Sequence, residues 1–187
     1  MKRLTTAALL VCLPLAPVAA EDLDKQVKEA KGVMMGFMKE LKGELKSAMK
    51  EGGPVNAIEV CNTVAPGIAK KQSEQSGWAV GRTSLKVRNP DNAPDAWERE
   101  VLNRFEARKA EGEPAKKLMH AEVVEQDGQK RVRVMKAIPT GKVCLKCHGT
   151  DIDPKVKAKL DELYPQDKAR GFNKGDIRGA FTLSKPM

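Results

Sequence analysis

The chain has 187 residues, of which 34 are Lys or Arg and 25 are Asp or Glu, so its formal net charge is +9. A chain of this length can bury one sizeable core and suits a single domain. The positive charge is compatible with nucleic-acid binding, but two Trp, one Tyr and four Phe provide few rings to stack on bases. We therefore expect no nucleic-acid partner, and an acidic protein or another anionic surface fits the charge better.

The first 20 residues have the pattern of a secretory signal peptide. Lys2 and Arg3 precede an apolar stretch over 5–18, and small residues lead to a cleavage site after Ala20. The stretch is short for a membrane span and contains two prolines, so we expect it to be removed rather than kept as an anchor. The sequence thus predicts one domain over 21–187, in the periplasm or secreted, without a stable membrane anchor.

Two amphipathic helices are expected at the start of the exported chain. The first spans about 22–51, where apolar residues recur every three or four positions. Gly52-Gly53-Pro54 ends it, and a second helix is expected over 54–71. Cys61 shares the apolar stripe of this second helix, so we expect its thiol to point into the core. The apolar positions are Leu23, Val27, Ala30, Met34, Met38, Leu41 and Leu45 on the first helix, and Ala57, Val60, Val64 and Ile68 on the second.

The rest of the chain mixes short strands with short helices. Two strands flank a turn at 126–130 as a hairpin. Asp95 is placed to cap a helix that runs to about Ala110. In chain order we expect a strand over 78–87, a helix over 95–110, strands over 118–125 and 131–138, a helix over 154–163 and a strand over 179–184. Helices followed by an antiparallel sheet that helices interrupt predict the α+β class.

The residues Cys144-Leu145-Lys146-Cys147-His148 form the motif with the strongest chemical meaning. Two cysteines at this spacing can each bond one vinyl group of haem, and the histidine that follows is then placed beneath the iron. Haem attachment takes place after export, so the predicted signal peptide supports the same conclusion. The sequence therefore predicts one covalent haem c, held by Cys144 and Cys147, with His148 as an iron ligand.

Two other uses of these cysteines stay open. A thioredoxin-like redox pair would lie in a βαβ unit, and the expected elements contain no such unit. A structural zinc site would combine Cys144, Cys147 and His148 with Cys61. Once Cys12 leaves with the signal peptide, three cysteines remain, and an odd number in an oxidising compartment needs an explanation.

The residues alone leave the second axial ligand of the iron open. Cys61 is an inward thiol without a partner, although an inert buried cysteine is common. His120 lies on a mixed face of the hairpin, where a surface or hydrogen-bonded role is usual. Met119 and the helical cluster of Met34, Met35 and Met38 are expected to pack in the core.

Four stretches of the sequence are similar to the PAS-like c-type haem domains of bacteria, a family catalogued as a domain of unknown function. They follow one order over nearly the whole exported chain. They are Ala57 to Cys61 with Ala65-Pro66, Arg82 to Pro90 with Trp97-Glu98, Cys144 to Gly149, and Gly175 to Ala180. The resemblance implies a PAS-like antiparallel sheet with the long N-terminal helices packed around the haem. It also implies a cysteine sulfur opposite the histidine, which places Cys61 beside His148 as a ligand of the iron.

Two groups of basic residues in the sequence each have a functional and a purely structural interpretation. Lys142, Lys146, Lys155, Lys157 and Lys159 would form a positive rim that steers an acidic redox partner, or simply a solvated helix face. On the strand expected over 78–87, a single face carries three basic residues, Arg82, Lys86 and Arg88. These would pair with the haem propionates or lie at the surface, and a surface strand is the default expectation.

The function suggested by the resemblance is redox or small-gas sensing, because members occur as small secreted proteins or as the sensing half of histidine kinases. This sequence shows neither a transmembrane helix nor a kinase domain, so a soluble electron carrier is the alternative. A peroxidase-like enzyme would need a distal acid-base residue, for which only His120 is a candidate. We therefore expect no enzyme, and a redox or signalling protein as partner.

Overall fold

The structure, a computed structural model, describes residues 17–187, with side chains from Asp22 onward. The expected signal peptide falls almost wholly outside these residues and stays a prediction. In chain order the helices are α1 (Pro17–Ser76), α2 (Ala96–Ala110), α3 (Leu145–His148) and α4 (Pro154–Leu163), and short 3-10 turns lie at Pro90–Asn92 and Ala115–Lys117. The strands are β1 (Ala79–Thr83), β2 (Met119–Gln126), β3 (Gln129–Pro139) and β4 (Ile177–Pro186).

The four strands form one antiparallel sheet in the order β1-β4-β3-β2. β2 and β3 are joined by Asp127-Gly128, and both residues have positive φ, as the tightest hairpin turns require. The strand at the C-terminal end of the chain, β4, pairs with β3 along most of its length and with β1 on its other side. Together with the long N-terminal helix, this sheet confirms the predicted α+β class.

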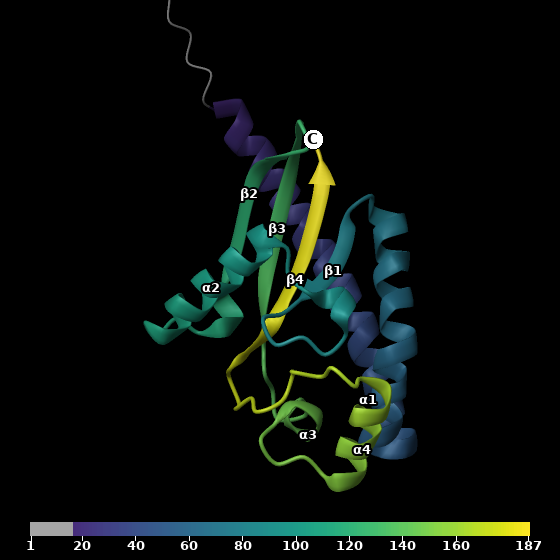
Figure 1. The fold of residues 1–187 in the computed structure, drawn as a ribbon. Helices are drawn as coiled ribbons and strands as arrows, with labels where there is room; N and C mark the ends of the chain where they lie inside the picture. The colour runs from purple at the N-terminus through teal and green to yellow at the C-terminus, as the bar shows by residue number, and fades with distance from the viewer. Residues whose placement is uncertain (1–16) are drawn as a thin grey trace, which may run out of the picture.

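The helix α1 bends at Gly53, whose φ of 70° lies outside the helical range. The segment before the bend crosses one face of the sheet, and the segment after it doubles back beside the first, where Lys71 and Gln72 bond to Glu40 (Figure 1). From the first segment, Ala30, Met34 and Phe37 pack against side chains of β3 and β4, among them Val134. Helix formation resumes directly after the bend because Pro54 occupies a first-turn position, where its missing N–H is not needed.

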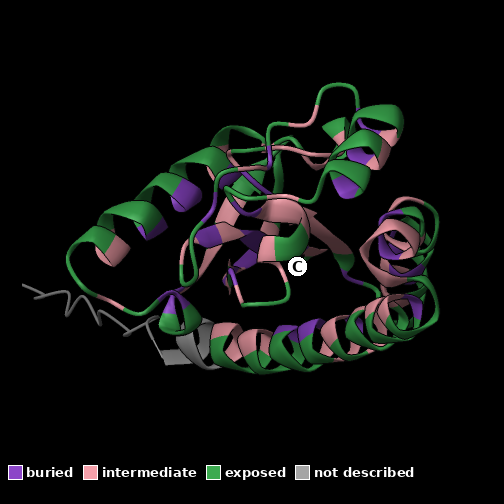
Figure 2. Ribbon diagram, turned by 90° about the horizontal axis from the view of Figure 1, so that it is seen from below, coloured by how far each residue is buried: buried purple, intermediate pink, exposed green. Residues whose placement is uncertain are grey.

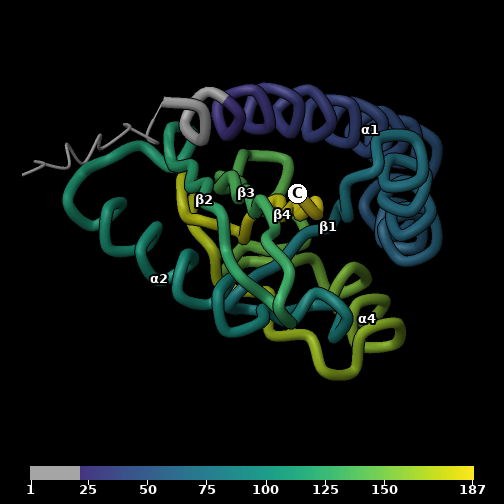
Figure 3. Tube along the Cα trace, turned by 90° about the horizontal axis from the view of Figure 1, so that it is seen from above, coloured from purple at the N-terminus to yellow at the C-terminus, as the bar shows by residue number. Residues whose placement is uncertain are grey.

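The helix α2 covers the opposite face of the sheet (Figure 3). Asp95 accepts a hydrogen bond from the Glu98 backbone N–H, and the Glu98 side chain accepts one from the Asp95 N–H, which confirms the predicted N-cap. Val101, Leu102 and Phe105 pack against residues of β3 and β4. Figure 2 shows the buried residues of α1 and α2 on the sides that face the sheet.

A third apolar cluster lies beyond one end of the sheet, where α3 and α4 are placed (Figure 1). Ile58, from the part of α1 after the bend, packs against Val156 and Leu160 of α4 and against Tyr164. Cys147 packs against the same cluster. This cluster therefore brings the Cys-x-x-Cys-His motif next to the helix segment that carries Cys61.

Two local predictions were wrong. The first strand ends at Thr83 instead of continuing to residue 87, because Ser84 turns the chain: its hydroxyl donates to the carbonyl oxygens of Arg178 and Lys86. Val64, expected on the inner stripe of α1, is exposed, and Ile58 and Ala65 are buried instead. Within residues 17–187 no helix is both long and apolar enough to cross a bilayer.

Candidate haem site

The Cys-x-x-Cys-His motif folds into a single helical turn, α3. The backbone N–H groups of Cys147 and His148 both donate to the Cys144 carbonyl oxygen, at 3.2 and 2.9 Å. A Cβ at Gly149 would lie 2.6 Å from the Leu145 carbonyl oxygen, so the turn needs a glycine directly after the histidine. The thiols of Cys144 and Cys147 are free and half-buried. One turn thus presents both sulfurs and the imidazole from neighbouring positions.

The His148 imidazole is oriented by a backbone carbonyl. Its Nδ1 lies 2.8 Å from the Ala169 oxygen, which can only accept, so Nδ1 carries the proton and Nε2 keeps its lone pair. Burial lowers the pKa of His148 to about 2, and the positive charges of Arg178 and Arg88 act in the same direction. The ring is therefore neutral at ordinary pH, with the nitrogen that a metal ion needs available.

The carbonyl that orients His148 is itself held by Arg88 and Asp167. Arg88 Nη2 donates to the Cys147 oxygen at 2.6 Å and to the Ala169 oxygen at 3.3 Å. Its Nε and Nη2 also reach the two Asp167 carboxylate oxygens, each at 3.1 Å. Asp167 in turn accepts the Ala169 N–H at 2.8 Å. We call Arg88 and Asp167 the clamp, because they fix both the motif and the residue that orients its histidine.

The clamp is buried, which sets its charge states. The side chains of Arg88 and Asp167 are 10% and 1% exposed. Burial alone would raise the pKa of Asp167, but hydrogen bonds from Arg88 and Arg170 hold that pKa below its ordinary value. The pair is therefore ionised in the folded protein. Sequence reasoning missed Asp167 because it lies far from Arg88 in the chain and carries no motif of its own.

Two further arginines face the site without a carboxylate. Arg178 donates to the Ser84 hydroxyl at 3.1 Å, and its Nε lies against the His148 ring, 3.2 Å from Nδ1 and 3.4 Å from Nε2. Arg82 lies over the Phe37 ring at 5.8 Å. Burial lowers the pKa of both guanidinium groups, that of Arg178 to about 10, so both stay charged at neutral pH. Neither forms an ion pair with any residue whose side chain the structure describes.

The three basic residues expected to share one face therefore have three different environments. Arg82 is partly buried at the site, Arg88 belongs to the clamp, and only Lys86 is exposed. The expected surface strand is wrong for the two arginines because the chain turns after Thr83. Arg178 was not singled out from its own chemistry, although the stretch Gly175 to Ala180 in the family resemblance contains it.

Cys61 lies on α1 near the motif and the arginines. Burial raises the pKa of its thiol, while the charges of Arg82, Arg88 and Arg178 oppose that rise. A charged Cys61 would in turn raise the pKa of Cys147, so the two sulfurs share one electrostatic environment. Its side chain is partly buried, as the inward stripe predicted. The fold thus brings Cys61 and the motif to one region, although they are distant in sequence.

The other ligand candidates have different surroundings. His120 lies 3.3 Å from both Arg104 and Glu122 and stacks near Trp97. Met34 is buried in the core between α1 and the sheet, and Met38 and Met119 pack against that core, whereas Met35 is exposed. His120, Met34, Met38 and Met119 thus have the surface or packing roles expected of them, whereas the core position expected for Met35 is wrong.

The zinc alternative needs a compact set of donors. Over the part of the chain whose side chains are described, no three His, Cys, Asp or Glu residues lie close enough together to hold one metal ion. A haem iron needs only one protein ligand on each of its two faces, and the porphyrin occupies the space between them. Two free thiols beside a neutral imidazole and two arginines without carboxylates fit an anionic porphyrin better than a zinc ion.

The lysine rim is only partly as expected. Lys142, Lys146, Lys155 and Lys157 are exposed, and among the described side chains none of them forms an ion pair. Lys159 differs because it pairs with Glu59 at 2.8 Å and with Glu162 at 2.9 Å. Four of the five lysines therefore remain free to meet an anionic surface.

Comparisons with known proteins identify the family of the chain. No curated protein matches the chain. The crystal structure of the cyanobacterial heme-protein Tll0287 is similar, with 26% sequence identity and a TM-score of 0.64 over 89% of this chain and 96% of that one. The model of the Tll0287-like family matches residues 20–186. The chain therefore belongs to the Tll0287-like family, which confirms the family resemblance seen in its sequence.

Proposed function

We propose that this protein is an exported c-type haem protein with one covalent haem and a redox-linked role. Cys144 and Cys147 would hold the porphyrin through two thioethers, each formed by adding an S–H across a vinyl group without net oxidation. His148 would hold the iron through Nε2. The observation that carries the proposal is the α3 turn, where two free thiols precede an imidazole whose Nδ1 proton is held by Ala169. The similar structure is that of a heme-protein, which supports the proposal.

The mass of the exported protein tests this proposal. Expressed in a host that matures c-type cytochromes, the chain should carry one porphyrin that survives denaturation, after loss of its first 20 residues. The variant Cys144→Ser/Cys147→Ser should lose covalent haem, whereas Cys61→Ser should keep it. A wild-type product without added porphyrin mass would contradict the proposal.

We also propose Cys61 as the second axial ligand, as the family resemblance implies. Its position near Cys147 supports this, and the charges of three arginines offset part of the burial that raises the pKa of its thiol. A thiolate donates negative charge to iron and stabilises the ferric state, so the reduction potential should be low.

The substitution Cys61→Ala tests the axial ligand separately from haem attachment. It should abolish the low-spin thiolate signature in the ferric EPR spectrum and raise the reduction potential by roughly 100 mV or more, a few kcal/mol for one electron. Met119→Ala serves as the control, because Met119 packs against the core and should leave the spectrum unchanged. An unchanged ferric spectrum in Cys61→Ala would refute the assignment.

The redox-linked role is best described as redox or small-gas sensing. The proposed sulfur ligand and the histidine lie on separate elements, α1 and α3, so loss of one ligand would remove one link between them and leave the apolar cluster around Ile58. The reduced protein should then bind carbon monoxide at low concentration as Cys61 leaves the iron. A six-coordinate spectrum that is the same in both oxidation states would instead favour the soluble electron carrier, which the four exposed lysines also support.

A further inference from the structure

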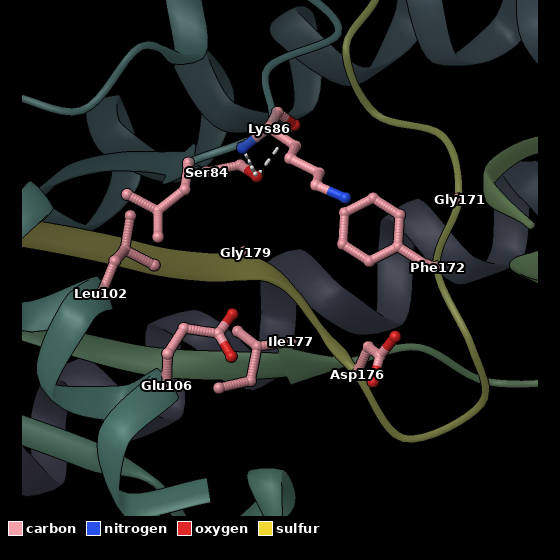
Figure 4. A pocket seen from close by; sticks show the side chains of 10 residues that line it. Ser84, Lys86, Leu102, Glu106, Gly171, Phe172, Asp176, Ile177 and Gly179 are labelled. Carbon is pink, nitrogen blue, oxygen red and sulfur yellow. Dashed lines mark hydrogen bonds between the residues drawn. The ribbon is translucent and has the colours of Figure 1, made fainter. Parts of the chain in front are cut away.

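A cavity of about 390 Å³ lies between α2, the turn after β1 and the loop that leads into β4 (Figure 4). Its volume falls in the range of sites that bind small organic molecules. Cys61, Cys144, Cys147 and His148 do not line it. The cavity is therefore distinct from the proposed haem site, although two of its lining residues, Ser84 and Phe172, also contact that site.

Two opposite charges in this cavity have no ionic partner. The Lys86 ammonium lies 5.1 Å from the centre of the Phe172 ring, and Glu106 extends from α2 on the other side (Figure 4). Among the described side chains neither residue forms an ion pair. Asp176 also lines the cavity, but Lys109 and the Asn173 N–H already hold its carboxylate. Lys86 and Glu106 thus remain to bind a ligand.

The surface between these charges includes four large apolar side chains. Leu85, Leu102 and Ile177 line it together with the Phe172 ring. Partial burial raises the pKa of Glu106, which indicates a less polar environment than open solvent. A molecule with two charged groups and an apolar body would satisfy both charges and cover this surface.

We propose that this cavity binds a small zwitterion with an apolar body, for which an apolar amino acid is the simplest example. The ligand carboxylate pairs with Lys86, the ligand ammonium pairs with Glu106, and the side chain lies against Leu102 and Ile177. Because Lys86 and Glu106 are exposed, solvent screens these pairs, and we expect a Kd of roughly 1 mM or somewhat tighter.

Phe172 connects this cavity to the proposed haem ligand. Its ring meets the His148 ring edge to face, with centroids 6.2 Å apart. The Arg178 guanidinium lies over the same ring at 5.5 Å and is held by Ser84. A ligand that moves Lys86 or Phe172 therefore changes the surroundings of His148. This second step rests on the proposed haem function, whereas the binding step does not.

Calorimetry on the holoprotein can test the binding step with three probes of similar apolar body. L-leucine carries both charges, 4-methylpentanoate only the carboxylate, and 3-methylbutylamine only the ammonium. Leucine should bind roughly threefold to fivefold more tightly than either analogue. In Lys86→Met, leucine should bind no more tightly than the amine. In Glu106→Gln, leucine should bind no more tightly than the acid.

Matched controls are available on exposed residues that form no ion pair among the described side chains. Lys39→Met on α1 and Glu111→Gln after α2 should leave leucine binding unchanged. The proposed site would be refuted if leucine bound no more tightly than its singly charged analogues. It would also be refuted if leucine bound both cavity variants with the affinity of the wild type.

The same titration followed by visible and EPR spectroscopy tests the connection to His148. Leucine should shift the ferric spectrum of the wild type but not that of Lys86→Met. Tight leucine binding with an unchanged spectrum would overturn the connection. A protein without covalent haem would contradict the proposed function, while calorimetry would still decide on the cavity.

Discussion

At the scale of single residues, the positive charge beside His148 belongs to Arg178. Its guanidinium is held by Ser84 and Phe172, and no carboxylate among the described residues neutralises it. A fixed positive charge near iron stabilises the reduced state relative to the more positive oxidised state. We therefore expect Arg178 to raise the reduction potential.

The first prediction is that Arg178→Gln lowers the reduction potential by some tens of mV, on the order of 1 kcal/mol for one electron. Spectroelectrochemical titration of the holoprotein measures this change. Arg178→Lys keeps the charge and should recover most of the potential. Arg104→Gln, on the exposed side of α2, should have no effect. A potential that is equal in Arg178→Gln and the wild type would contradict this role.

The residues proposed to bind the haem stand out in the sequence, but those that position them do not. Cys144, Cys147 and His148 are neighbours in the chain, so one local pattern identifies all three. Arg88 and Asp167 meet only after the sheet and α4 have formed, and a single sequence gives no sign of that pairing. Arg82 was expected at the surface of a longer strand. The turn at Ser84 that ends this strand depends on the distant Arg178 carbonyl oxygen, which the local sequence does not indicate.

At the scale of elements, the clamp joins the loop after β1 to the loop after α4. Lys168 donates its backbone N–H to the Val87 oxygen, and Gly171 and Phe172 donate theirs to Gly149 and His148. The Arg88–Asp167 ion pair lies at the centre of these contacts. Removing one partner of a buried pair leaves the other charge without compensation.

The second prediction is that Asp167→Asn lowers the free energy of unfolding at pH 7 by about 3 kcal/mol. Because the pKa of Asp167 is lower in the folded than in the unfolded chain, its stabilisation is complete above the unfolded value near 3.8. This stabilisation is lost as the pH falls below 3.8 and through the lower pKa that Asp167 has in the folded chain. Urea unfolding from pH 7 to pH 3 should therefore show the two proteins converging only in the acid range.

Asp161→Asn is the matched control for that experiment. Asp161 pairs with Arg170 at 2.6 Å, but its side chain is 56% exposed. Its loss should change stability by less than about 1 kcal/mol. A gap between Asp167→Asn and the wild type that stayed constant down to pH 3 would show that the carboxylate charge is not the cause.

The end of β1 depends on a glycine in β4. Gly179 has a φ of 157°, and a Cβ there would overlap the Thr83 carbonyl oxygen and lie 3.0 Å from the Ser84 side chain. Ser84 is also the residue that turns the chain and holds Arg178. The third prediction is that Gly179→Ala lowers the free energy of unfolding by roughly 2–3 kcal/mol and alters the ferric spectrum.

Gly43→Ala is the control for this substitution, because Gly43 is exposed on α1 and a Cβ there meets no atom within 4 Å. It should stabilise the protein by about 0.5–1 kcal/mol and leave the spectrum unchanged. Thermal unfolding of the holoproteins measures both effects. Equal stability of Gly179→Ala and the wild type would mean that β4 can move away from β1 without penalty.

Elements with complete local signals were predicted well. The capping box at Asp95, the Asp127-Gly128 turn and the proline-led α4 each lie in a few consecutive residues. The bend of α1 was predicted as the end of one helix and the start of another. In the structure Gly53 alone absorbs the change in direction, because its positive φ lets the helix resume at Pro54.

At the scale of the whole molecule, positive charge gathers near the motif as exposed lysines. The fourth prediction is that electron exchange with an acidic protein slows as ionic strength rises, because salt screens attraction over distances of about 10 Å. Lys146→Glu/Lys157→Glu should slow it by roughly tenfold at low salt. Lys39→Glu/Lys42→Glu, on α1, should have little effect. A rate that is independent of salt would mean that these lysines form only a solvated surface.

The bend in α1 has a mechanical consequence. If Cys61 and His148 bind the same iron, the metal joins the helix segment after Gly53 to the α3 turn. Such a crosslink encloses about 90 residues, and a disulfide that closes a loop of this size would stabilise a fold by roughly 4–5 kcal/mol. A change of one electron at the iron that released the sulfur would open this crosslink, and the bend at Gly53 is the place where the freed segment could swing.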